Sequence, residues 1–169
     1  MPTTLSHLTF IVKDLDRSAQ FFKTIFDAKE VYSSGPKTFS LSQEKFFLIG
    51  SLWLCIMQGE PLAERTYNHT AFKIQESDFD EYLARIKDSG AEIKPERPRV
   101  PGEGRSIYFY DFDNHLFELH AGTLAERLDC YAQSRIYDPF YSEENQARLA
   151  RSIADAEAGK VTIHELIED

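Results

Sequence analysis

Residues 5–12 read LSHLTFIV, and a copy of this pattern returns 62 positions later, where residues 67–74 read YNHTAFKI. The same offset carries DAKEV at 27–31 onto SGAEI at 89–93. A constant offset between several segments is typical of a duplicated structural unit. We therefore predict two modules of one design, each with a histidine at the same place on its first strand.

The composition limits the class of protein. The chain has 169 residues, 42% of them hydrophobic, which is enough to bury one globular core. Its net charge of -9 argues against a nucleic-acid partner, because phosphate binding needs a basic surface. No apolar run approaches the roughly 20 residues that span a bilayer, and the N-terminus lacks the apolar segment of a signal peptide. Cys55 and Cys130 are too few for a disulfide framework, so we expect a cytoplasmic protein without a membrane partner.

The periodicity of apolar residues predicts the elements of both modules. The first module, at 4–61, is expected to contain one helix and several short strands: a strand at 5–12, a helix at 14–26, and strands at 28–33, 39–41, 45–49 and 53–57. The second module, at 62–130, repeats this order: a strand at 67–74, a helix at 77–89, and strands at 91–95, 105–110 and 116–120. The arrangement is approximately βαβββ twice, which is an α+β fold. Asp14 is the predicted N-cap of the first helix.

The chain after residue 130 has a different character. We predict a linker at 131–141, where proline and aromatic residues gather, and a helical tail at 142–169. Ser142 is expected to cap a helix that runs to Ala158, because serine is a favoured N-cap and acidic residues follow it in the first turn.

His7 and His69 are candidate metal ligands because the repeat gives them equivalent positions, and such a site needs a third ligand. In the strand at 116–120, alternation places Glu118 on the face opposite Phe117, where an enclosed carboxylate requires a partner or a metal. Glu118 is therefore the predicted third ligand, and His120, on the same face, is the alternative. Two imidazoles and a carboxylate suit Mn²⁺, Fe²⁺ or Zn²⁺.

The segment at 97–105 reads RPRVPGEGR and gathers three arginines in an acidic chain. Its prolines and glycines disfavour regular structure. Two interpretations are open, a solvated loop or a loop that binds an anion through guanidinium groups and backbone amides.

The paired modules, the set of His7, His69 and Glu118, and the run GRSIYFYD at 104–111 resemble the vicinal oxygen chelate superfamily. Within it, the chain is similar to the fosfomycin-resistance proteins of the hydrolytic FosX type over about residues 4–130. The resemblance implies a homodimer whose sites are shared between chains. It also implies Mn²⁺ as the cofactor and addition of water to the oxirane of fosfomycin, a small phosphonate.

The resemblance further implies roles for single residues. Glu44, in SQEKFF at 42–47, matches the general base of the hydrolytic members, and Thr9 lies two residues from His7 on the same strand face. The expected phosphonate-binding residues carry hydroxyl or guanidinium groups: Ser106, Tyr108 and Arg127, with Arg99 and Arg105 as additional positive charge. The metal ligands remain His7, His69 and Glu118.

Three other functions are weighed against hydrolysis. A thiol transferase that adds glutathione or a similar thiol to fosfomycin is disfavoured, because the chain lacks the lysine-bearing potassium loop of those members and has Gly102 where they carry serine. A drug-sequestering module such as a bleomycin-binding protein lacks the metal triad. An extradiol dioxygenase uses the triad with Fe²⁺ but needs no phosphonate site.

The tail is similar to the C-terminal segment of antitoxins of the RelB/DinJ kind, from FYSEEN at 140–145 to the end of the chain. This similarity implies a toxin partner. The alternative is an amphipathic appendage that packs on the dimer through three aliphatic side chains, Leu149, Ile153 and Ile163.

Overall fold

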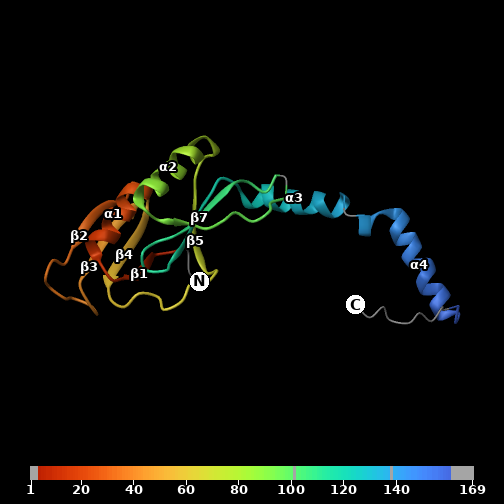
Figure 1. Ribbon diagram of the computed structural model, residues 1–169, viewed down its shortest axis with the longest axis horizontal. Helices are drawn as coiled ribbons and strands as arrows, with labels where there is room; N and C mark the ends of the chain where they lie inside the picture. The colour runs from red at the N-terminus through yellow and green to blue at the C-terminus, as the bar shows by residue number, and fades with distance from the viewer. Residues whose placement is uncertain (1–3, 101, 138, 161–169) are drawn as a thin grey trace. The chain divides into compact units, whose positions relative to one another are not determined.

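The computed structural model describes residues 4–100, 102–137 and 139–160 (Figure 1). It divides into two compact units. The first unit comprises Met1–Pro98 and Gly104–Thr123, and the second comprises Arg99–Glu103 and Leu124–Asp169.

The first unit contains two βαβββ modules, as the repeat predicts. The elements of the first module are β1 (His7–Val12), α1 (Leu15–Phe26), β2 (Lys29–Ser33), β3 (Glu44–Ile49) and β4 (Leu52–Gln58). Those of the second module are β5 (His69–Lys73), the short helix η1 (Glu76–Asp78), α2 (Phe79–Ser89), β6 (Glu92–Ile93), β7 (Ser106–Tyr110) and β8 (Leu116–His120). The strand orders β1-β4-β3-β2 and β5-β8-β7-β6 are the same, and in both sheets the first strand runs parallel to the last. The predicted α+β fold is confirmed.

One predicted strand is absent and another is shorter than predicted. Residues 39–42 form bends between β2 and β3, and Phe39 and Leu41 are exposed, because no strand within the described residues pairs with this apolar stretch. The predicted strand at 91–95 ends after Ile93, two residues before Pro95, which has no amide hydrogen for a ladder. Local hydrophobicity suggested strands in both places, but strand formation also requires a partner.

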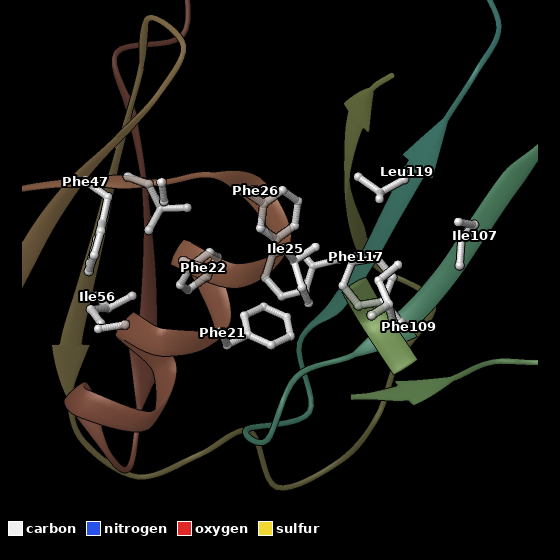
Figure 2. Packing of buried hydrophobic residues seen from close by; sticks show 14 of the residues in the cluster. Phe21, Phe22, Ile25, Phe26, Phe47, Ile56, Ile107, Phe109, Phe117 and Leu119 are labelled. Carbon is white, nitrogen blue, oxygen red and sulfur yellow. The ribbon is translucent and has the colours of Figure 1, made fainter. Parts of the chain in front are cut away.

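The core of the first unit lies around α1, between the two sheets. Figure 2 shows the α1 phenyl rings between Phe47 and Ile56 of the first sheet and Phe109 and Phe117 of the second. The rings of Phe22 and Phe117 are 5.7 Å apart, at a favourable edge-to-face angle. Each sheet therefore turns one face toward this core. Because side chains alternate along a strand, the residues between the core residues lie on the opposite face.

Asp14 caps α1, as predicted, because its carboxylate accepts hydrogen bonds of 3.0 Å from the amides of Asp16 and Arg17. We expect Asp14→Ala to lower the free energy of unfolding by about 1 kcal/mol, since two amides of the first turn lose their acceptor. Urea unfolding followed by circular dichroism measures the change. Asp14→Asn is the matched control, because it removes the charge but keeps an oxygen that can accept both amide hydrogen bonds, and its effect should stay below about 0.5 kcal/mol. Equal effects of both substitutions would contradict the capping role.

The hairpin turn between β7 and β8 of the second module contacts the first module. Asp113, at the turn between β7 and β8, accepts a 2.9 Å hydrogen bond from the amide of Lys13 at the end of β1. Asp111 supports this turn, because its carboxylate accepts bonds from the amides of Asp113 and His115 and lies 2.7 Å from the His115 ring nitrogen. These contacts fix the second sheet against the first strand of the other module.

The second unit contains α3 (Leu124–Tyr137), η2 (Pro139–Tyr141) and α4 (Glu143–Glu157). The α3 helix continues to Tyr137, beyond the start of the predicted linker at 131. Ser142 accepts a bond from the Asn145 amide and caps α4, as predicted. Residues 161–169 of the predicted tail, including Ile163, lie outside the described residues. Among the residues that are described, no helix is long and apolar enough to cross a membrane.

Candidate functional site

The face of the second sheet that points away from the core gathers four of the predicted site residues. His69 on β5, Glu118 on β8 and Ser106 on β7 lie on adjacent strands. The Nε2 atom of His69 is 3.0 Å from Oε2 of Glu118, and the Ser106 hydroxyl donates a 2.6 Å hydrogen bond to Oε1. The same hydroxyl is 2.8 Å from Nδ1 of His120. The strand register therefore places the predicted ligand His69 and the alternative ligand His120 beside the carboxylate of the predicted ligand Glu118.

The ring of His69 is oriented by its other contact. Its Nδ1 atom lies 2.8 Å from the carbonyl oxygen of Tyr67. A carbonyl oxygen only accepts, so Nδ1 carries a hydrogen and Nε2 is the nitrogen that faces Glu118, 3.0 Å from Oε2. An imidazole nitrogen and a carboxylate oxygen at this distance can share one cation, which is either a proton or a metal ion. The donor set thus fits a divalent metal, with a backbone contact that orients the imidazole as in many metal sites.

The surroundings of Glu118 favour its charged form. Burial works to raise the pKa of this carboxyl. Hydrogen bonds from Ser106 and Tyr108, together with the neighbouring His69 and His120, outweigh burial and bring the pKa below its usual value. The carboxylate is therefore held ionised at neutral pH, as a metal ligand must be.

Two tyrosines border this site. The sequence predicted Tyr108 as a site residue but did not predict Tyr67. Burial, followed by contacts with Tyr67 and Glu118, raises the pKa of Tyr108, so that its hydroxyl stays protonated. Tyr67 was missed by the sequence reasoning, although it lies two residues before His69 on the repeat. Its ring packs 5.2 Å from His69 and 6.0 Å from Tyr108. Both tyrosines line a cavity of about 330 Å³ that Lys94 also borders.

The corresponding face of the first sheet carries three further predicted residues. His7 and Thr9 on β1 pair with Trp53 and Cys55 on β4. The His7 side chain is exposed and packs on the Trp53 indole, with ring centroids 4.4 Å apart. Glu44, the first residue of β3, is buried at 8% exposure. The sheet thus places a predicted ligand and the predicted base on one face.

Cys55 lies between Thr9 and Glu44 on this face. Burial, and then the negative charge of Glu44, raises the pKa of the Cys55 thiol to about 11. We expect alkylation of Cys55 by iodoacetamide at pH 8 to be about 100-fold slower than that of a free thiol, because the thiolate is the reactive form. Peptide mapping by mass spectrometry distinguishes Cys55 from Cys130. Fast labelling of Cys55 in the folded protein would contradict this expectation.

One chain does not bring all the predicted residues together. Within the described residues, no three His, Cys, Asp or Glu side chains form a group that could hold a metal ion. Arg105 turns toward α2, where it bonds to Glu76 and Asp80 and its guanidinium lies 3.5 Å from the centre of the Phe79 ring. Two further predicted arginines, Arg99 and Arg127, belong to the second unit.

Comparison with known proteins places these features in a family. Residues 4–119 match the model of the Glyoxalase/Bleomycin resistance protein/Dioxygenase superfamily. The Fosfomycin resistance protein FosX of Listeria monocytogenes is 68% identical over 131 residues, which cover 78% of this chain and 98% of the relative. The Metallothiol transferase FosB of Staphylococcus saprophyticus is 34% identical over 145 residues, 83% of this chain and 91% of the relative.

A solved structure shows the same fold. It is that of a mutant of the Listeria monocytogenes FosX, complexed with Mn(II) and 1S,2S-dihydroxypropylphosphonic acid. It superposes with a TM-score of 0.71 and 63% identity, covering 78% of this chain and 99% of that chain. These matches give no support to the predicted similarity of the tail to antitoxins.

Proposed function

Because this chain belongs to the Glyoxalase/Bleomycin resistance protein/Dioxygenase superfamily and, within it, to the FosX fosfomycin resistance proteins, we propose that it opens the oxirane ring of fosfomycin with water. The observation that carries the proposal is the pair of His69 and Glu118, whose ring nitrogen and carboxylate oxygen lie 3.0 Å apart, close enough to bind one cation together. The dihydroxypropylphosphonate bound by the relative has the constitution of a propylphosphonate epoxide plus one water, which is the expected product.

The metal ligands are His7, His69 and Glu118, and the ion is Mn²⁺, as in the relative's structure. When bound, such an ion supplies Lewis-acid polarisation of the ring oxygen. Since one chain does not gather the three ligands, we propose a homodimer in which His7 of one chain completes the site that His69 and Glu118 form in the other. An isologous dimer then contains two equivalent sites.

Glu44 is the proposed general base. It accepts a proton from the attacking water, whose oxygen bonds to a ring carbon while the bond from that carbon to the ring oxygen breaks. The ring oxygen takes up a proton from solvent and becomes the second hydroxyl of the diol. The place of Glu44 on the same sheet face as His7 and Thr9 supports this role, because a general base must lie within reach of the water that it deprotonates. Thr9 shares the face of His7 and offers its hydroxyl to the substrate.

The phosphonate dianion requires hydrogen-bond donors and positive charge. Ser106 and Tyr108 are proposed to supply hydroxyl groups, since both lie beside Glu118. Arg127 and Arg99, which belong to the second unit, are proposed as sources of positive charge on the strength of the family resemblance alone. Arg105 has the least support for this role, because its guanidinium already forms ion pairs with Glu76 and Asp80.

A product assay tests the reaction. Protein loaded with Mn²⁺ is incubated with fosfomycin in ¹⁸O-labelled water, with and without glutathione, and the products are identified by ³¹P NMR and mass spectrometry. A diol with one ¹⁸O atom, formed equally in both conditions, is the expected result. A glutathione adduct as the main product would contradict hydrolysis and favour the thiol-transfer alternative.

Mixing of two inactive variants tests the shared site. His7→Ala and Glu118→Gln each remove one ligand, so neither homodimer should be active. In a mixed dimer one of the two sites receives all three native ligands, so random exchange should restore about a quarter of the wild-type activity. No restoration after verified subunit exchange would show that each site is built by a single chain.

The tail at 142–169 lies outside residues 4–119, which match the family model. We propose that it is an accessory segment, and toxin binding by residues 142–169 remains a prediction. A pull-down with the full chain and with a chain that ends at residue 139 tests it. An identical set of bound proteins would exclude a toxin partner for the tail.

A further inference from the structure

We propose that Trp53 is a positioning residue for His7, which holds the imidazole in the orientation that metal binding requires. This inference rests on the proposed role of His7 as a ligand. It concerns how an exposed side chain on an edge strand becomes a well-oriented ligand.

The contact between the two rings is close and comes from adjacent strands. His7 and Trp53 are register partners in the parallel pairing of β1 with β4. Their ring centroids are 4.4 Å apart and their planes are inclined by 32°. The Nδ1 atom of His7 lies 3.2 Å from the Ser6 hydroxyl, so Nε2 is the nitrogen left for a metal. The indole face limits rotation of the imidazole, which is otherwise exposed.

Trp53 is itself held by a row of aromatic rings across the sheet. Its ring lies 5.3 Å from Phe46 on β3 at an edge-to-face angle of 67°. Phe46 in turn lies 4.7 Å from Tyr32 on β2. The row His7, Trp53, Phe46, Tyr32 therefore crosses all four strands in their spatial order β1-β4-β3-β2. Such cross-strand aromatic contacts stabilise a sheet and fix ring orientations.

The equivalent histidine of the second module is oriented by different residues. His69 has Leu116 as its register partner, where His7 has Trp53. Its aromatic contacts come instead from Tyr67 and Tyr108, and a carbonyl oxygen receives its Nδ1 hydrogen. Both histidines thus have aromatic neighbours, but only in the first module does the register partner of the histidine supply the aromatic ring. The two modules therefore differ at this position, because Trp53 can pack against its histidine with an aromatic face and Leu116 cannot.

Mn²⁺ affinity is the direct measure of this role. Contacts that orient a ligand typically change metal affinity by 10–100-fold when removed. We expect Trp53→Leu to raise the Mn²⁺ dissociation constant by about 10-fold. Without the indole the imidazole rotates freely in the metal-free protein, so the entropy cost of fixing it falls on the binding step. Trp53→Phe keeps an aromatic face and should stay within about 3-fold of the wild type.

The experiment uses the metal-free full-length dimer and measures free Mn²⁺ by electron paramagnetic resonance. Leu48→Ala is the matched control, because Leu48 is the register partner of Trp53 on β3, on the side away from His7. This variant should bind Mn²⁺ like the wild type. Trp53 is also the chain's single tryptophan, so its emission should change on Mn²⁺ binding with the same midpoint. That change should be lost in His7→Ala.

The outcomes separate the two hypotheses. If the wild type binds Mn²⁺ and Trp53→Leu binds it equally well, the positioning role is overturned and the metal site stands. The positioning role is also overturned if Leu48→Ala weakens binding as much as Trp53→Leu, because the effect then belongs to the sheet as a whole. If the wild type binds no Mn²⁺, both the metal site and the role of Trp53 are wrong. Should Trp53→Leu fail to fold, Trp53→Met, which also lacks an aromatic face, takes its place: a loss of affinity of about 10-fold supports the role, and affinity equal to that of the wild type overturns it.

Discussion

Glu118→Gln is expected to lower kcat/KM for fosfomycin by at least about 10³-fold while leaving the fold intact, because the amide is a poor ligand and a bound metal supplies several kcal/mol of charge stabilisation. The amide retains the shape of the carboxylate, and its oxygen can still accept the hydrogen bond from Ser106. Its NH₂ group can donate to the Nε2 lone pair of His69, 3.0 Å from the present carboxylate oxygen. The metal-free variant should therefore keep its fold, although it loses the stabilisation that the ionised carboxylate contributes at neutral pH.

The pH dependence of stability provides an independent check on this substitution. The folded-state pKa of Glu118 lies below its usual value, so the unfolded chain binds a proton first as the pH falls. The stabilisation from this group is present above the usual carboxyl pKa and is lost as the pH falls through the lower folded-state pKa. Thermal unfolding of metal-free protein between pH 7 and pH 3 should show a smaller acid loss in Glu118→Gln. An unchanged kcat/KM, or loss of the fold at pH 7, would contradict the ligand role.

The repeat at His7 and His69 predicted much of the architecture, because it fixes two equivalent strands and the helix after each. Alternation along β8 also predicted that Glu118 would lie opposite the core face that carries Phe117, as observed. Both predictions depend on local periodicity and need no knowledge of distant contacts.

The features that sequence reasoning missed depend on pairing between distant segments. Trp53 becomes a neighbour of His7 only through the parallel register of β1 and β4, 46 positions apart in sequence. The charge of Arg105 suggested an anion-binding residue, but in the fold its guanidinium forms ion pairs with carboxylates of η1 and α2. The stretch around Phe39 has the apolar character of a strand but lacks a partner. Spacing along the chain does not report which strands become neighbours.

Glu44→Gln should separate metal binding from chemistry. General-base catalysis typically contributes about 10²–10⁴-fold, so kcat for hydrolysis should fall by that factor. Glu44 is not among the proposed metal ligands, and the affinity for Mn²⁺ should therefore change little. This combination distinguishes Glu44 from Glu118, whose replacement should reduce affinity and activity together.

The neighbouring thiol reports on the same substitution. Since the charge of Glu44 helps to raise the pKa of Cys55, Glu44→Gln should lower that pKa and speed alkylation of Cys55 at pH 8. Stopped-flow or NMR assays give kcat, resonance titration gives the Mn²⁺ affinity, and mass spectrometry gives the labelling rate. Glu60→Gln, which changes an exposed carboxylate after β4, is the control and should leave all three unchanged. Full hydrolytic activity in Glu44→Gln, with faster labelling of Cys55, would show that the carboxylate lies near the thiol but does not act as the base.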